Sequence, residues 1–322
     1  MDKRRVMVVT ALLTIISMQG VAQNSVRWSG LFYMDYEYVL SSSDEEQEGE
    51  NGFDYRRMYL TADYTLSEEF SGRARLEGAG GPETIRPFVK DLYLTWHGVL
   101  GDGHNLIFGV QPPPAFTLSE KIWGYRSLEK TIMDRQGVSS SRDMGVSAAG
   151  ALAGDGELTY SLMVGNNNSI RGEDDKYKRV YGQLAFLSGN VAASVGGDYA
   201  SGEDRNAVTA SAFAGYALKQ IRLGVEGFFQ QFDYVNSNVS TDRRGLSGWI
   251  VTPVTEKVEL VGRVDVVEND VGSGSVDETY LIGGVAFKPN RKVHFIPNVY
   301  VVDMTGQSDL EIAGRVTLHA DF

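Results

Sequence analysis

Hydrophobic and polar residues alternate along most of this chain with the two-residue period of a β-strand. In residues 26–38 every even position is apolar, aromatic or glycine, whereas the odd positions include Arg27, Asp35 and Glu37. Residues 309–322 repeat the pattern, with all of their charged side chains at odd positions. Because successive side chains of a strand point to opposite faces, each segment has one uncharged face and one polar face.

The contrast between the two faces holds over the eight segments in which the alternation is clearest. The 42 positions of the uncharged face contain no Asp, Glu, Lys or Arg, whereas the 40 positions of the opposite face contain 18. An ionised side chain at mid-bilayer costs a transmembrane barrel about 2–4 kcal/mol, so the contrast predicts that the uncharged face contacts lipid. A soluble β-sandwich is the alternative, but its buried face would favour branched aliphatic residues, and here Gly, Ala and aromatic residues are mixed in. The segments are residues 26–38, 57–66, 70–78, 91–97, 221–230, 258–267, 293–301 and 309–322.

Aromatic residues of the uncharged face gather near the strand ends. Transmembrane barrels carry such residues in two girdles, one at each membrane interface. The chain is therefore predicted to be all-β and to form a transmembrane antiparallel β-barrel. We expect one girdle from Trp28, Phe70, Trp96, Phe186, Phe287 and Phe322, and the other from Tyr38, Phe53, Tyr199 and Phe229.

The whole sequence predicts sixteen strands joined by alternating short and long connections. An even strand number places both chain ends on the periplasmic side, together with the short turns; counts of fourteen and eighteen also fit the pattern. Pro253 and Pro297 fall inside predicted strands, and because a barrel has no free edge we expect a bulge or a displaced boundary at each. The predicted strands are 25–39, 53–66, 70–79, 87–98, 104–111, 142–153, 157–166, 176–187, 190–200, 206–218, 220–235, 244–254, 257–268, 278–288, 292–303 and 309–322.

The third long connection, residues 112–141, differs from the others in length. Its stretch from Leu118 to Met133 predicts a helix, with Thr117 or Ser119 as the N-cap. A connection of about 30 residues in a compact barrel is usually functional, so we expect this loop to fold into the lumen and narrow it. An external cap or a disordered loop is the alternative.

The first 22 residues predict export. A basic start, an apolar stretch over residues 6–18 and small residues before position 23 indicate a signal peptide cleaved after Ala22. Residues 23–322 would then form a barrel in the outer membrane of a Gram-negative-type bacterium, in contact with lipid and lipopolysaccharide. This mature chain carries 27 Lys and Arg against 41 Asp and Glu and has no cysteine. The charge argues against a nucleic-acid partner, and the lack of cysteine excludes disulfides and thiolate metal sites.

Several short segments carry a family resemblance. Residues 109–116 (GVQPPPAF) end a predicted strand, residues 133–135 (MDR) follow in the third loop, residues 141–146 (SRDMGV) lead into the next predicted strand, and residues 260–265 (LVGRVD) lie in a late strand. Together with the terminal Phe322, these segments resemble the phosphate-selective porin O/P family, within the outer-membrane general porin superfamily. The likeness runs across most of residues 53–322 and implies a sixteen-stranded, trimeric channel with an inward-folded third loop. Three prolines stand where that family has a basic segment. The resemblance therefore implies a channel, but it does not imply selectivity for phosphate.

The chain is therefore expected to be an outer-membrane porin that lets small hydrophilic solutes or ions diffuse passively, with a moderate preference for anions. Charged side chains that line a pore set its ion preference, and low-dielectric walls focus their field. The alternative is that each inward Arg pairs with an inward acid and only fixes the barrel shape. Such pairs would join Arg73 or Arg75 to Glu77, Arg263 to Asp265 and Arg222 to Glu226. The candidate pore-lining residues are Arg57, Arg73, Arg75, Glu77, Lys121, Arg126, Lys130, Arg135, Arg179, Arg222, Arg263, Asp265 and Arg315.

No catalytic residue, cofactor or metal site is predicted. The four histidines are His97, His104, His294 and His319; the last two are assigned to separate inward faces, without a nucleophile at a recognisable spacing. Acidic runs in the long connections, such as residues 44–48, are typical of solvated loops. Two other functions remain open: a non-conducting scaffold or adhesin with a plugged lumen, and a substrate-specific channel for hydrophobic compounds.

Overall fold

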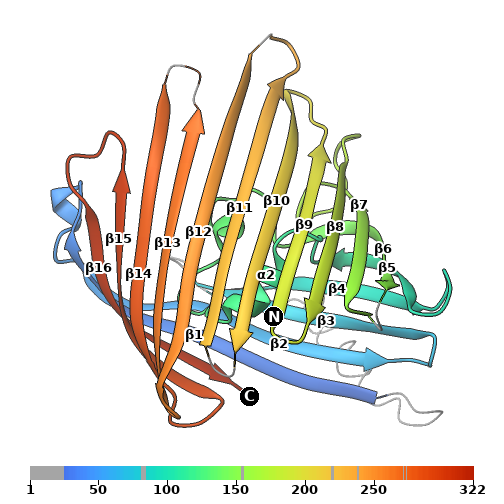
Figure 1. The fold of residues 1–322 in the computed structure, drawn as a ribbon, viewed down its shortest axis with the longest axis horizontal. Coiled ribbons are helices and arrows are strands. Elements are labelled where there is room, and N and C mark those ends of the chain that lie inside the picture. Colours follow the sequence, from blue (N-terminus) through green and yellow to red (C-terminus); the bar gives the residue numbers. More distant parts are fainter. Residues whose placement is uncertain are drawn as a thin grey trace, which may run out of the picture.

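The computed structural model of the protein describes residues 25–80, 85–153, 156–218, 221–237, 239–270, 272 and 274–322. Within these residues, sixteen antiparallel strands form one closed barrel, in which β1 pairs with both β2 and β16 (Figure 1). The predicted fold class is confirmed, whereas the expected leader at residues 1–22 lies outside the described residues. The strands are β1 (Ser25–Ser41), β2 (Asn51–Thr65), β3 (Phe70–Ala79), β4 (Arg86–His97), β5 (His104–Gln111), β6 (Asp143–Ala153), β7 (Leu158–Gly165), β8 (Arg179–Ser188), β9 (Val191–Ala200), β10 (Arg205–Leu218), β11 (Ile221–Tyr234), β12 (Ser240–Thr255), β13 (Val258–Asp270), β14 (Ser275–Phe287), β15 (Val293–Met304) and β16 (Glu311–Asp321).

Each predicted strand has a counterpart in the structure, and the boundaries at residues 70–79 and 104–111 agree without change. The largest difference is in β12, which begins at Ser240 rather than at residue 244. Its first residues pair with β11 and β13, beyond the point where apolar residues alternate. The hydrophobic pattern ends where contact with lipid would end, but backbone pairing continues past it.

The two ends of the barrel differ. The turn end carries the short connections, together with the start of β1 and the C-terminal Phe322. The loop end carries the longer connections, and the first of these contains the 3-10 helix η1 (Glu45–Gln47). In Figure 1 the loops rise at the top of β8 to β14.

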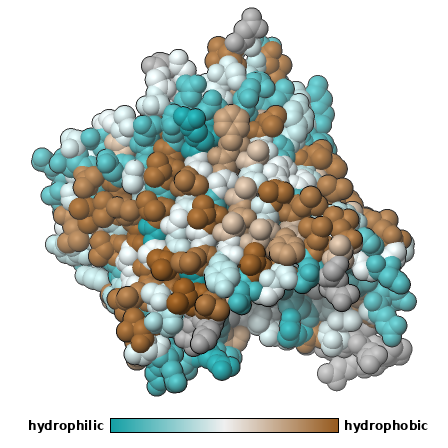
Figure 2. All heavy atoms as spheres, viewed as in Figure 1, coloured by the Kyte–Doolittle hydropathy of each residue, from teal (hydrophilic) through white to brown (hydrophobic). Residues whose placement is uncertain are grey.

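The outer surface carries the apolar belt that the alternation predicts. Figure 2 shows a brown band across the middle of this face, with teal above and below it. Trp28 and Phe322 are exposed at the turn end, and Phe53 and Tyr199 are exposed at the loop end, as expected for two aromatic girdles. Among the described residues, no helix is both long and apolar enough to cross a membrane.

The two prolines within strands behave differently. The β12–β13 register shifts between Pro253 and Thr255, so the expected bulge is confirmed there. Pro297 pairs in register with Val316 of β16. On the other edge of β15, the pairing with β14 is interrupted between Gly284 and Phe287. Because proline has no backbone N–H, the ladder is interrupted on one side without an inserted residue.

The third loop, L3 (residues 112–142), folds into the barrel as predicted, and its ribbon lies within the ring of strands in Figure 1. The expectation of a single helix from Leu118 to Met133 is wrong. Two short helices form instead, α2 (Thr117–Trp123) and α3 (Ile132–Arg135), because Gly124 ends α2 in the left-handed conformation. Neither Thr117 nor Ser119 caps α2; its N-cap is Phe116, and the Ser119 hydroxyl donates to the Phe116 carbonyl.

Candidate pore constriction

L3 is held against one wall of the barrel by apolar packing. Trp123, Leu128 and Ile132 of L3 are fully buried. Trp123 and Leu128 belong to a cluster with inward residues of β9 to β15, and the Trp123 and Trp249 rings lie 5.4 Å apart. Ile132 belongs to a second cluster that includes Phe228 of β11. Where L3 lies against it, the inward side of this wall is therefore a packed core.

Buried polar groups of β8, β13 and β16 hold the loop backbone. Arg263 forms an ion pair with Asp265, with Nη2 and Oδ2 2.6 Å apart, and both side chains are almost fully buried. Arg263 also donates to the Lys130 carbonyl of L3. Arg315 donates to the Leu128 carbonyl at 3.3 Å, and Arg179 donates to the Val138 carbonyl at 2.9 Å. These arginines position L3.

Arg135 of α3 adds an ionic anchor. Its guanidinium lies 3.2 Å from Asp265 and forms a second ion pair with Glu278 of β14. The ring of Tyr280 packs beneath it, 4.3 Å from the guanidinium carbon. Both helices of L3 are therefore tied to the wall formed by β9 to β15.

The opposite wall carries an excess of positive charge. Glu77 lies between Arg57 (2.7 Å) and Lys90 (2.9 Å). Asp91 lies between Arg75 (3.2 Å) and Arg142. These four bases, three from β2 to β4 and Arg142 from the end of L3, are called the basic cluster; they share two acids, so the group retains a net charge of about +2.

Two β-bulges bring in charged residues that strict alternation would place outside. The β1–β2 register shifts so that Arg56 is an extra residue, and Arg56 and Arg57 both reach inward. The β3–β4 register shifts at Lys90, so Lys90 and Asp91 both reach inward. A bulge inserts one residue into one strand and changes the face that its neighbours occupy. Sequence reasoning missed Arg56 and Lys90 for this reason.

L3 contributes further bases. Arg126 lies 2.9 Å from both Glu120 and Asp134 of the same loop. Lys121 is exposed, and neither Lys121 nor Lys130 has a carboxylate within 4 Å among the described residues. Residues 112–142 carry five bases and three acids, so the loop itself is positive.

The structure corrects several expected ion pairs. Arg73 pairs with Asp63 (2.6 Å) and not with Glu77. Arg222 pairs with Glu259, at 3.7 Å, and not with Glu226. The predicted residues therefore form three groups. Arg135, Arg179, Arg263, Asp265 and Arg315 hold L3 in place; Arg57, Arg75, Glu77, Lys121, Arg126 and Lys130 belong either to the basic cluster with its acids or to L3; and Arg73 and Arg222 lie near the turn end.

Two histidines that the sequence analysis placed on separate faces are in contact. His294 and His319 are cross-strand partners, with ring centroids 4.9 Å apart. His319 Nε2 lies 3.1 Å from Asp321, and Tyr33 meets the His319 ring edge-on. The register between β15 and β16, which the sequence alone did not define, brings them together.

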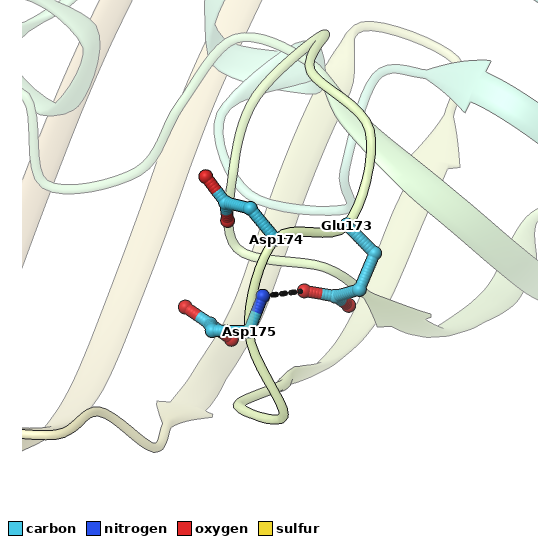
Figure 3. Close-up of side chains that lie close together, drawn as sticks. All are labelled: Glu173, Asp174 and Asp175. Carbon is cyan, nitrogen blue, oxygen red and sulfur yellow. Dashed lines mark hydrogen bonds between the residues drawn. The ribbon is translucent and has the colours of Figure 1, made fainter.

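One exposed loop gathers three carboxylates. Glu173, Asp174 and Asp175, between β7 and β8, have oxygen atoms within 4.8 Å of one another. Figure 3 shows Glu173 turned back onto the Asp175 backbone amide, a hydrogen bond of 3.1 Å. Lys178 also pairs with Glu173 and lowers the pKa of its carboxyl group. These contacts satisfy Glu173 without an ion, and the cluster has the solvated character expected of an acidic loop.

No protein-family model matches the chain, and no curated protein sequence matches it significantly. Solved structures do match. The anion-selective porin from Comamonas acidovorans is 13% identical, with 93% of this chain and 100% of that chain covered and a TM-score of 0.70. OmpT of Vibrio cholerae, in a trimer form, is 13% identical, with 94% and 100% covered and a TM-score of 0.70. OmpF of Salmonella typhi, in complex with daunomycin, is 10% identical, with 93% and 98% covered and a TM-score of 0.69. At these identities the likeness establishes the fold: the chain has the barrel architecture of outer-membrane porins.

Proposed function

We propose that the protein is an outer-membrane porin through which small hydrophilic solutes diffuse passively, with a preference for anions. The observation that supports this function most strongly is the asymmetry inside the barrel. L3 is fixed to the wall of β9 to β15, and the four bases on two acids lie on the other side. A site with this charge excess and low-dielectric walls attracts anions.

The compartment and processing belong to the same proposal. A closed barrel satisfies all backbone hydrogen bonds without water, which is what a lipid environment requires. The exposed apolar belt would be unfavourable in water and fits a bilayer. We infer that residues 1–22 are a signal peptide, that the mature barrel resides in the outer membrane of a Gram-negative-type bacterium, and that the loop end faces outwards.

The alternative, in which each inward Arg is neutralised by an inward acid, holds for part of the interior. Arg263 with Asp265 and Arg73 with Asp63 are paired one to one. The basic cluster is not, and Lys121 has no carboxylate partner among the described residues. The excess charge of the basic cluster thus lies on the side opposite the core of L3, which supports anion preference there.

The likeness to the phosphate-selective porin O/P family remains part of this proposal. It is supported by the inward third loop and by Arg263 and Asp265 in a late strand, as in the family segment. Pro112, Pro113 and Pro114 stand where that family has bases, so we propose general anion preference and not phosphate selectivity. Because one matching structure is a trimer form, we propose a homotrimer.

A second function is favoured by a specific observation. The bases of the cluster are largely covered, with Lys90 only 12% and Arg57 only 16% exposed. Tight filling of this kind would suit a non-conducting scaffold or adhesin. We propose a channel rather than an enzyme because buried interior charges such as Arg135, Arg263 and Asp265 pair with one another or hold L3.

Planar-bilayer recording separates these functions. Protein folded into a bilayer should conduct steadily, and under a KCl gradient its reversal potential should have the sign for anions. A reversal potential with the cation sign would refute the anion preference. A barrel that inserts fully yet carries no current would refute the channel and favour the scaffold.

A further inference from the structure

A pocket separate from the basic cluster opens at the loop end, between L3 and the ends of β8 to β13. Its volume is about 1010 Å³, which is in the size range of small-molecule sites. Gly137 and Val138 of L3 form part of one side, and Arg179, Arg205 and Arg243 line the wall.

Arg243 lies in this pocket with its charge uncompensated. Its guanidinium donates to the Gln230 side-chain oxygen (2.8 Å) and to the Gln136 and Gly137 carbonyls (2.8 and 3.3 Å). No carboxylate lies within 4 Å of it among the described residues. Neutral acceptors hold the side chain in position but do not cancel its charge, so the guanidinium remains attractive to an anion.

Arg205 adds a second charge beside the first. The guanidinium carbons of Arg205 and Arg243 lie 4.4 and 5.4 Å from the centroid of the Phe232 ring. Arg205 is exposed and has no ion pair among the described residues. By contrast, Arg179 is paired with Asp198 at 2.7 Å. Phe232 therefore holds two unpaired guanidinium groups near one another, and such a pair can receive one carboxylate.

The rim of the same pocket is acidic. Glu203 and Asp204, in the β9–β10 connection, line it together with Asp242 and Asp270 at the outer ends of β12 and β13. None of these acids is in an ion pair among the described residues. The pocket therefore holds charges of both signs, and a simple polyanion would be repelled by its acids.

We propose that this pocket binds small zwitterionic solutes, such as free amino acids or short peptides, with the carboxylate at Arg205 and Arg243 and the ammonium group at the acidic rim. Both charges of the solute then have a partner, and the Phe232 ring offers an apolar surface between them. This inference rests on the proposed channel for its biological use, but the binding itself does not need conduction.

The test is a calorimetric titration of the detergent-folded protein with L-alanyl-L-alanine, acetate and ethylammonium. The dipeptide should bind more tightly than either single-charge probe. Arg205→Gln should weaken dipeptide binding about tenfold or more, as expected for loss of a charged partner. Arg243→Gln should do the same, but Arg205 is the cleaner site because Arg243 also holds L3. Glu203→Gln combined with Asp204→Asn should weaken binding of the dipeptide and strengthen binding of acetate, because it removes the partner of the ammonium group and the repulsion on an anion.

The neighbouring residue provides a matched control. Arg244 points outwards, is 61% exposed and pairs with Glu268 at 2.8 Å, so Arg244→Gln should leave dipeptide binding unchanged. Absence of dipeptide binding, acetate binding as tight as that of the dipeptide, or equal effects of Arg205→Gln and Arg244→Gln would each overturn the inference. A barrel that conducts but does not bind the dipeptide refutes only this inference, and one that binds but does not conduct refutes only the proposed function.

Discussion

At the residue scale, the interior charges divide into buried pairs that hold structure and a cluster with excess charge. Arg263 and Asp265 are paired one to one, whereas Glu77 and Asp91 each serve two bases. Alternation in the sequence predicted that Arg57, Arg75 and Asp265 point inwards. It could not predict Lys90, because an inserted bulge residue leaves no mark in a two-residue pattern.

The excess charge predicts a graded change in ion selectivity. Lys90→Gln removes one base while Glu77 keeps Arg57 as its partner at 2.7 Å, so the barrel should remain folded. The anion-to-cation permeability ratio should fall by roughly half, because the net charge of the cluster falls from about +2 to about +1. Reversal potentials under a KCl gradient measure this ratio. If the permeability ratio is unchanged in both Lys90→Gln and the control Arg244→Gln, the basic cluster does not determine the ion preference.

The buried pair predicts a loss of stability. Asp265→Asn leaves Arg263 in a site where it is only 1% exposed, and breaking a buried pair in this way costs about 3–5 kcal/mol. Asp63→Asn serves as the control, because its partner Arg73 is 29% exposed and the pair is worth about 1 kcal/mol or less. Urea unfolding of the barrel in lipid vesicles gives both values. Equal losses in the two variants would show that Arg263 is not as buried as described.

At the element scale, the strands were predictable and the third loop was only partly so. Lipid on one face and water on the other produce an alternation that can be counted, which is why sixteen strands emerge from the sequence. The inward direction of L3 followed from its length and the family resemblance. Its break into α2 and α3 did not, because a glycine such as Gly124 can also stand inside a helix and does not by itself mark a helix end. The packing of Trp123 onto Trp249 joins residues far apart in sequence and left no local signal.

This packing predicts that one side chain fixes L3. Trp123→Ala removes a fully buried ring, and a core Trp→Ala change typically costs about 3–5 kcal/mol. L3 should loosen while the barrel persists, so trypsin should cleave after Lys121 or Arg126 and the single-channel current should become noisier. Trp28→Ala, on the outer face, should leave both readouts unchanged. Resistance of L3 to trypsin in Trp123→Ala would mean that its polar anchors suffice.

At the scale of the whole molecule, the barrel positions everything else. Closure of β1 onto β16 leaves no free strand edge, so the outer face can be apolar throughout its belt. The exposed Arg244 and Glu268 pair lies beyond that belt at the loop end. The wall behind L3 became a packed core, a feature that alternation alone cannot distinguish from a wet pore wall.

The four tryptophans offer the most direct test that one face of the strands contacts hydrocarbon. Trp28 and Trp96 are exposed on the outer face, whereas Trp123 and Trp249 are buried inside. In vesicles of brominated lipid, fluorescence of the variant that keeps only Trp28 and Trp96 should be strongly quenched, and fluorescence of the variant that keeps only Trp123 and Trp249 should be nearly unaffected. Equal quenching of the two variants, or none in either, would contradict the membrane barrel described here.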